Sequence, residues 1–398
     1  MRNIILFDAA EVRENLLPMT FTRPVADLRV GIFTIREKWE RVLESAYSYL
    51  TVDYLQEKYP TIVADDNIFV AGNICPTELL VAGIMALNQG EALLSPKGEL
   101  MAFRGSMEDF NSRNFVKEIV CDEDCLSISM LYDIFMQNRR GIVEDFALLT
   151  RGRTSQPLSD TNTIIGTPID TNGNPMIFIE EGAVVEGAML NVKNGPIYVG
   201  RDAEVMEGSC LRGPIALCEH AVINMGARVY GATTLGPYCK VGGEVNNVVM
   251  MGYSNKAHDG FLGNAVIGEW CNIGGGSTAS NLKNDYTEIK LWNYPAHRFL
   301  RTGLQFCGLI MGDHSKSGIN CMFNTATVLG VGVNIHGAGF PRNFVASFSE
   351  GSVSGFTDVP LTKFFDIARR MMARRGMELT EVDMRIFESI HAIADNYK

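Results

Sequence analysis

The sequence lacks a long apolar run, and no stretch of it approaches the roughly 20 apolar residues that a membrane-spanning helix needs. Its first ten residues are typical of a β-strand and show no apolar core followed by a small-residue cleavage site. A formal net charge of −11 leaves no basic excess for nucleic acid or an anionic membrane. We therefore expect a cytoplasmic protein that binds neither nucleic acid nor membrane.

Cysteine pairs that would build a disulfide framework are also missing. The nine cysteines are an odd number, and among them only Cys121 and Cys125 stand close together. No second pair and no nearby histidine completes a tetrahedral zinc site at these two residues. We predict reduced thiols and no metal at this pair.

What the sequence does contain is a six-residue repeat in its second half. Neither the period of an α-helix nor that of an ordinary strand gives this spacing, which is typical of a left-handed parallel β-helix with three hexapeptides per coil. An aliphatic residue recurs at Val199, Val205, Leu211, Leu217, Ile223, Val229, Leu235 and Val241, and a mostly small series stands two places earlier at Ile197, Ala203, Ser209, Ile215, Ala221, Ala227, Thr233 and Cys239.

The repeat is interrupted twice before it returns. Residues 243–260 are rich in Asn, Lys and His, and residues 281–306 are basic and aromatic. Loops on a rigid scaffold are where binding and catalytic residues gather, so both inserts are candidate sites. Between the inserts the repeat resumes at Leu262, Ile267 and Ile273, with one spacing of five. After the second insert the period of six returns at Met311, Ser317, Phe323, Leu329 and Ile335.

The flanking regions have different patterns. Segments 3–7, 67–72 and 100–103 predict strands, and segments 32–47 and 128–139 predict helices, so an α/β domain is expected over 1–160. The β-helix is predicted over 161–355, and a C-terminal helical cap over 356–398. In the cap, Gly376 separates two predicted helices, Thr380 and Asp383 predict a capping box, and an Arg-rich stretch is interpreted as a solvated face: Arg369, Arg370, Arg374 and Arg375.

One histidine has polar company. His258 follows Lys256 inside the first insert, and Asn272 and Asn281 follow within two coils. The run Asn255-Lys-Ala-His258, then Phe261-Leu-Gly, then Asn272-Ile-Gly-Gly-Gly-Ser277, then Asn281-Leu-Lys283 resembles the acetyltransferase site of the bifunctional enzymes that acetylate glucosamine-1-phosphate and then uridylylate it. In that family a sugar nucleotidyltransferase domain precedes the β-helix, which is the domain order expected here.

The resemblance implies a role for each matching residue. His258 would be the general base that takes a proton from the sugar amine as it attacks acetyl-CoA. Asn272 and Asn281 would bind the sugar, and Lys256 and Lys290 its phosphate. Phe261 and Lys283 fall in the same substrate segment, and Gly275 and Ser277 would face acetyl-CoA. In this family acetyl-CoA lies between subunits, so a homotrimer is expected.

Some positions depart from the family pattern. Phe261 stands where the family has Tyr, so that hydroxyl is absent, and Asn246 stands where a phosphate-facing Lys is expected. The reaction class is therefore better determined than the identity of the amino sugar.

The N-terminal domain departs further. Its first strand leads into Phe7-Asp-Ala-Ala-Glu-Val-Arg13, which has none of the glycines of the family's phosphate-binding loop. Arg23 is the candidate nucleotide-binding cation. Asn73 is the second candidate nucleotide-binding residue, and it stands where a carboxylate would hold Mg²⁺. Mg²⁺ is expected as a cofactor only if this domain catalyses nucleotidyl transfer from UTP to give a UDP-sugar.

Two alternatives to the acetyltransferase hypothesis remain, and a third is disfavoured. The chain is a sugar-1-phosphate nucleotidyltransferase whose β-helix only trimerises it, or a non-catalytic trimer that binds a sugar nucleotide. A zinc carbonic anhydrase on the same solenoid needs a close pair of metal-binding histidines, which the six histidines do not supply: His220, His258, His297, His314, His336 and His391.

Overall fold

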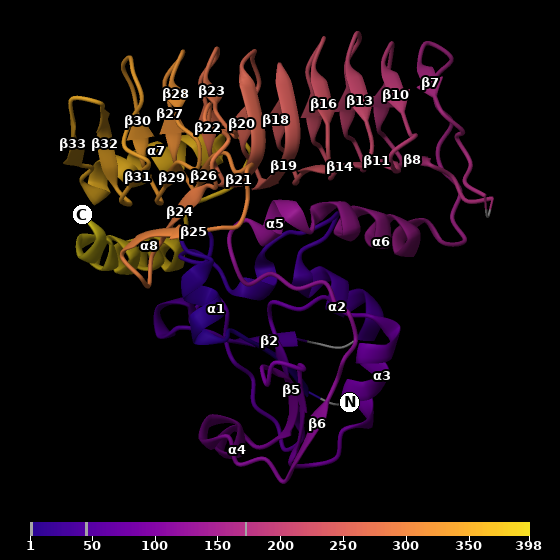
Figure 1. Cartoon of the computed structure of the whole chain (residues 1–398), viewed down its shortest axis with the longest axis vertical. Helices are drawn as coiled ribbons and strands as arrows, with labels where there is room; N and C mark the ends of the chain where they lie inside the picture. Colours follow the sequence, from indigo (N-terminus) through magenta and orange to yellow (C-terminus); the bar gives the residue numbers. More distant parts are fainter. Residues whose placement is uncertain (1–2, 44–46, 172) are drawn as a thin grey trace.

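The computed structural model describes residues 3–43, 47–171 and 173–398. An N-terminal α/β domain lies along one side of a long β-helix, and two C-terminal helices lie near the last coils (Figure 1). No helix of these residues is both long and apolar enough to cross a bilayer.

The N-terminal domain is built on a mixed six-stranded sheet in the order β2-β1-β3-β5-β4-β6. β1 is parallel to both β2 and β3, whereas β5 is antiparallel to β3 and β4. The strands are β1 (Asn3–Phe7), β2 (Tyr47–Leu50), β3 (Asn67–Ala71), β4 (Glu91–Leu94), β5 (Leu100–Gly105) and β6 (Lys117–Val120); the helices are α1 (Ala10–Asn15), α2 (Ile35–Leu43), α3 (Glu78–Ala86), α4 (Met107–Ser112), α5 (Asp133–Met136) and α6 (Asn138–Thr150).

The three predicted strands are present as β1, β3 and β5, but both predicted helices differ from the structure. Helix α2 is shorter than predicted: it ends at Leu43, residues 44–46 lie outside the described residues, and strand β2 begins at Tyr47. The helix predicted over 128–139 is two helices, α5 and α6, and the second continues to Thr150. Both errors are at element ends, where side-chain periodicity carries least information.

The β-helix has three faces whose strands pair in parallel with the coils before and after. Partners are 18 residues apart in the regular part, as for Ile197 with Ile215 and Ile215 with Thr233. The first face holds β7 (Thr163–Ile165), β10 (Met189–Asn191), β13 (Cys210–Arg212), β16 (Arg228–Tyr230), β23 (Thr278–Ala279) and β28 (Met322–Phe323); the second holds β8 (Ile177–Ile179), β11 (Ile197–Val199), β14 (Ile215–Leu217), β17 (Thr233–Leu235), β26 (Ile310–Met311), β29 (Val328–Leu329) and β31 (Phe344–Val345); the third holds β9 (Val184–Val185), β12 (Glu204–Val205), β15 (Val222–Ile223), β18 (Lys240–Val241), β20 (Asn255–Lys256), β22 (Asn272–Ile273), β27 (Lys316–Ser317), β30 (Asn334–Ile335) and β32 (Ser349–Ser352).

The predicted repeat coincides with the core of the β-helix. Every residue of the aliphatic and small series between 197 and 241 is at most 2% exposed. The later series from Met311 to Ile335 is buried as well. The prediction of a β-helix is therefore confirmed, because a spacing of six places each of these side chains inside one prism.

The first predicted insert is not an excursion. Residues 244–252 and 261–269 form β19 (Glu244–Gly252) and β21 (Phe261–Glu269), which pair in register and run across the first two faces. A strand that continues through a corner changes the six-residue spacing without leaving the coil. The second insert does leave it, as the antiparallel hairpin of β24 (Lys290–Asn293) and β25 (Arg298–Arg301).

The C-terminal cap begins with a strand. β33 (Gly355–Asp358) pairs with β32 before α7 (Leu361–Ala373) and α8 (Glu381–Ala394), so the predicted domain boundary at 355 falls inside a β-hairpin. The predicted break at Gly376 is confirmed by its φ of 68°, and the capping box of Thr380 and Asp383 is present. Phe364 of α7 and Phe387 of α8 both pack on the His314 ring of the β-helix.

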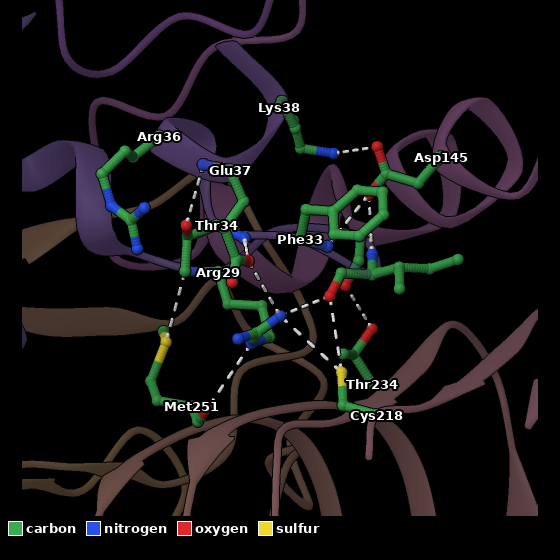
Figure 2. Close-up of polar contacts among 12 residues, drawn as sticks. Arg29, Phe33, Thr34, Arg36, Glu37, Lys38, Asp145, Cys218, Thr234 and Met251 are labelled. Atoms are coloured by element: carbon green, nitrogen blue, oxygen red, sulfur yellow. Dashed lines mark hydrogen bonds and ion pairs between the residues drawn. The ribbon is translucent and has the colours of Figure 1, made fainter. Parts of the chain in front are cut away.

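The N-terminal domain and the β-helix share buried contacts. Helices α5 and α6 lie along the second face of the β-helix (Figure 1), and Phe146 of α6 packs in one buried cluster with Phe178 and Tyr198. Polar groups are paired across this interface (Figure 2): the Arg29 guanidinium donates to the carbonyl of Met251, and the Thr234 hydroxyl donates to the carbonyl of Gly31.

Candidate functional site

His258 lies on a corner loop of the β-helix, between β20 and β21, and its side chain is exposed. The next coil places Gly275 directly beside it, because a Cβ built at Gly275 would be 3.3 Å from the Cβ of His258. A larger residue at position 275 would crowd the histidine. The corner therefore presents an accessible imidazole next to open backbone, which is the arrangement that a general base beside a thioester needs.

Lys256 is buried and hydrogen-bonded to the backbone of this corner. Its side chain is only 2% exposed, and its Nζ donates to the carbonyl oxygens of Gly242 at 2.9 Å and His258 at 2.6 Å. Burial lowers the pKa of Lys256 to about 8. The Lys256 ammonium is thus engaged with backbone carbonyls within the chain, and its binding of the substrate phosphate stays a prediction.

Ser277 also lies inside the scaffold. Its hydroxyl donates to the carbonyl of Gly318 at 3.0 Å and accepts from the backbone N–H of Cys321 at 3.2 Å. These bonds join two successive coils. The side chain is thus a structural link, whereas its proposed contact with acetyl-CoA stays a prediction.

Phe261 and Asn281 meet at one glycine. A Cβ at Gly263 would lie 2.5 Å from Cζ of Phe261 and 2.7 Å from Nδ2 of Asn281. The Asn281 amide also donates to Oδ1 of Asn264 at 2.7 Å. The structure therefore brings these two predicted substrate residues together on the coil that follows His258.

Asn272 lies on the third face, on the strand next to β20. It pairs in register with Asn255 on one side and with Lys316 on the other. It lines a groove of about 610 Å³ together with Ala257, the neighbour of His258. Asn272 and His258 are thus on adjoining parts of one surface.

The two predicted lysines of the second insert are placed elsewhere. Lys283 donates to the carbonyl of Glu288 at 3.0 Å, within the insert itself. Lys290 is exposed on β24, opposite Arg301. The β24–β25 hairpin lies on the side of the β-helix that faces the N-terminal domain (Figure 1). Within this chain the structure does not bring Lys290 to the His258 corner.

A second cleft opens in the N-terminal domain beyond the carboxyl ends of β1 and β3. Its volume is about 730 Å³, and Asn73 lines it with Asp8 and Arg113. Ligands in α/β sheets bind at this edge of parallel strands. The loop expected to cradle phosphates is here the start of α1, so the cleft offers no glycine-rich amide nest between Phe7 and Arg13.

Asp8 is the buried carboxylate of this cleft, with a side chain that is 3% exposed. It accepts hydrogen bonds from the Val25 N–H at 2.9 Å and the Thr51 hydroxyl at 2.6 Å. Burial raises the pKa of Asp8 to about 6, and the Thr51 bond and the Arg13 charge only partly oppose that rise.

Arg23, the candidate nucleotide-binding cation, is engaged within the chain, and its binding of nucleotide stays a prediction. Its buried guanidinium is 2.5 Å from Asp313 and 3.1 Å from Glu269, both in the β-helix, and the Thr22 hydroxyl donates to the same Asp313 at 2.7 Å. Burial raises the pKa of Glu269, with the Arg23 charge acting against it. Arg23 therefore joins two domains and does not line the cleft.

The Arg-rich stretch is exposed at Arg369, Arg370 and Arg374, as predicted for a solvated face, whereas Arg375 is half-buried. Arg370, Arg374 and Arg375 line the groove that holds Asn272, opposite Lys240 and Lys316. The i, i+4 spacing of Arg370 and Arg374 on one helix face was the available signal, but the face it would meet is formed by strands far away in the sequence.

Comparisons with known proteins each match part of the chain. Residues 4–154 match the family model described as a sugar nucleotidyl transferase. A bifunctional sugar-1-phosphate nucleotidylyltransferase/acetyltransferase of Sulfurisphaera tokodaii is 30% identical over 149 residues, which span 37% of this chain and 37% of that protein. The crystal structure of the polysialic acid O-acetyltransferase OatWY matches 51% of this chain and 86% of its own, at 15% identity and a TM-score of 0.21.

Residues 4–154, less than half of the chain, are thus similar to the sugar nucleotidyl transferase family. The resemblance to bifunctional nucleotidyltransferase–acetyltransferase proteins, drawn from the sequence motifs, is confirmed at the level of the family.

Proposed function

We propose that the chain is an acetyl-CoA-dependent N-acetyltransferase for an amino-sugar 1-phosphate of the glucosamine-1-phosphate type. The observation that carries the proposal is the exposed His258 beside Gly275, with Asn272 on the adjoining face. His258 would take the proton of the sugar amine as its nitrogen attacks the thioester carbonyl. The new N–C bond then replaces the C–S bond, and the coenzyme A thiol leaves.

The other site residues fit around this step. Asn272 and the Phe261–Asn281 pair would hold the sugar, and the open backbone at Gly275 would face acetyl-CoA near Ser277. Lys283 is a candidate for the sugar phosphate within this chain, and Lys290 would reach it only from another subunit. Lys256 would act as a positioning residue, because it fixes the carbonyl of His258.

The test is release of free thiol from acetyl-CoA in the presence of glucosamine-1-phosphate. His258→Gln should reduce turnover by about 10²–10⁴-fold, the range for losing a general base. His336→Gln is the matched control, since His336 is also exposed and follows β30 on the same face. If the wild-type protein releases no thiol with any amino-sugar phosphate, the proposal is wrong.

We also propose a homotrimer with acetyl-CoA bound between subunits. Large apolar side chains are exposed at loops that follow third-face strands, as His258 is: Met225 after β15 is 71% exposed and Ile319 after β27 is 75% exposed. Such side chains are typical of a surface covered by another subunit. Light scattering should give three times the chain mass, and a monomer would contradict the proposal.

A second activity is proposed for the N-terminal domain: nucleotidyl transfer from UTP to a sugar 1-phosphate. The observation that favours it is the cleft beside Asn73 in a domain that is similar to the sugar nucleotidyl transferase family. Among the described residues no group of three or more His, Cys, Asp or Glu is placed to hold a metal. Mg²⁺ would therefore be held partly by the nucleotide phosphates, which is its usual mode of binding.

Pyrophosphate release from UTP and a sugar 1-phosphate tests this activity. Asn73→Asp should change its rate and its Mg²⁺ dependence, whereas Asn111→Asp elsewhere in the cleft should not. If neither pyrophosphate nor thiol is released while a UDP-sugar still binds, the chain is a non-catalytic sugar-nucleotide-binding protein.

A further inference from the structure

The groove between the third face of the β-helix and helix α7 is strongly basic. Two lysines come from the β-helix, Lys240 and Lys316, and three arginines come from α7 and the turn after it, Arg370, Arg374 and Arg375. No carboxylate lines this groove among the residues that the structure describes. In a chain of net charge −11, five cations gathered without an acid need an explanation.

The floor of the groove is one row of side chains across four coils. Lys240 pairs with Asn255, Asn255 with Asn272, and Asn272 with Lys316. Neighbouring parallel strands are about 4.8 Å apart, so the two lysines are about 14 Å apart with two amide side chains between them. This row offers hydrogen-bond donors along its whole length.

The roof is one face of α7. Ile367, Arg370, Met371 and Arg374 follow the i, i+3, i+4, i+7 spacing that normally marks an apolar face against a core, and Arg375 extends it. Arg375 holds the end of the helix on the groove by donating to the Tyr238 carbonyl at 3.3 Å and to Oδ1 of Asn255 at 3.4 Å. Arg370 and Arg374 are exposed at the edge of the groove, and Arg375 is half-buried against its floor.

These charges are not neutralised within the described part of the chain. Other cations of the cap are paired: Lys363 with Glu350 and Arg369 with Asp366. None of the five groove cations forms an ion pair among the described residues. Burial lowers the pKa of Lys316 to about 8, and its Nζ donates only to the carbonyl of His314.

We propose that this groove binds the phosphoanhydride of a small ligand. Its volume of about 610 Å³ suits a small molecule, and paired arginine forks above a lysine–amide row match adjacent phosphate groups. Coenzyme A and a nucleoside diphosphate sugar both carry this chemistry. The groove shares Asn272 with the proposed acetyl-transfer site, so the inference partly rests on that proposal. Because binding is measured without turnover, failure of the groove and failure of acetyl transfer can be told apart.

The test is calorimetric titration of the full-length protein with inorganic pyrophosphate, coenzyme A and UDP in separate experiments. Binding of pyrophosphate at least ten times tighter than orthophosphate is expected. The tighter of coenzyme A and UDP identifies the source of the phosphoanhydride. Equal binding of orthophosphate and pyrophosphate, or binding of none of the three ligands, would overturn the proposal, as would tighter binding of an RNA oligonucleotide.

Two variants locate the site. The Arg370→Gln/Arg374→Gln double variant and Lys316→Gln should each weaken binding by more than 10-fold, with unchanged circular dichroism. Arg369→Gln is the matched control on the same helix, because Arg369 pairs with Asp366 and does not line the groove. If Arg369→Gln weakens binding as much as the groove variants, charge on the surface as a whole is responsible and the assignment is wrong.

Discussion

At the scale of single residues, the predictions depend on whether the partners of a residue are near it or far from it in the sequence. His258, Phe261 and Asn281 were predicted from motifs that resemble a family, and their roles stay predictions, although the structure places them on neighbouring coils. The contact of Arg23 with Asp313 could not be predicted, since the two residues are 290 positions apart and no local pattern indicates the pair. Lys256 was assigned to substrate although its own corner uses it as a donor to two carbonyls.

Lys256→Met should loosen the His258 corner. The substitution keeps much of the side-chain volume but leaves two backbone carbonyls without their donor, at a cost of about 1–3 kcal/mol each when such groups stay buried. Thermal unfolding should show the loss of stability, and thiol release should fall with little change in the KM for acetyl-CoA. Lys240→Met, on an outward-facing side chain, is the control for stability, and an equal loss there would contradict the structural role.

Asp8 should make stability depend on pH. Its pKa of about 6 in the folded protein is above the ordinary value of 3.8, so the folded state binds its proton more tightly than the unfolded state does. The stability that this proton contributes is present at low pH and is lost as pH rises from about 4 to about 6, by up to about 3 kcal/mol.

The measurement is thermal unfolding of the wild type and Asp8→Asn across that range. The variant should gain on the wild type as pH rises, whereas Glu11→Gln, an exposed carboxylate of the same cleft, should track the wild type. Parallel curves for all three proteins would show that Asp8 titrates normally.

At the scale of elements, periodicity predicted what repeats and missed what deviates. The coils from 197 to 241 follow from the sequence because each sixth side chain must enter one core. β19 was interpreted as part of an insert because a nine-residue strand that crosses a corner breaks the spacing of six while keeping its pairing. Helix α6 continues beyond its predicted end, where it contacts the β-helix. These contacts cannot be seen in the sequence.

The capping box of α8 provides a test at this scale. The Thr380 hydroxyl accepts from the Asp383 N–H at 3.1 Å, and Asp383 in turn accepts from the Thr380 N–H at 3.1 Å. Thr380→Ala should cost about 1 kcal/mol. Ser389→Ala, in the middle of the same helix, should cost less. Denaturant unfolding compares the two variants, and an equal loss of stability would show that the cap does not stabilise the helix.

At the scale of the whole molecule, the N-terminal domain and the β-helix are held by one continuous core. Buried residues of β1 and β3 belong to the same cluster as Val249, Met251 and Trp270 of the β-helix and as the cap helices. The sequence indicated separate domains, because composition changes along the chain whereas the faces that meet are visible only in three dimensions. The boundaries at 160 and 355 stay predictions.

The chain should therefore unfold in one transition that depends on the interdomain ion pair. Arg23→Met leaves Asp313 buried without its guanidinium, a change that typically costs about 3–5 kcal/mol. Calorimetry should show a single peak at a lower temperature. Asp313→Asn in the Arg23→Met background should recover part of the loss, and two separate peaks in the wild type would contradict a shared core.

Helix α6 sets a length that the β-helix cannot change freely. Its 13 residues extend about 20 Å, close to the width of the four coils whose strands β8, β11, β14 and β17 meet the N-terminal domain. A duplicated or deleted coil in this stretch would move the helix off its seat, whereas one added before β8 would leave it in place. Insertions of whole 18-residue units should therefore be tolerated before β8 and not between β8 and β17. The length of α6 thus limits the number of coils in this stretch.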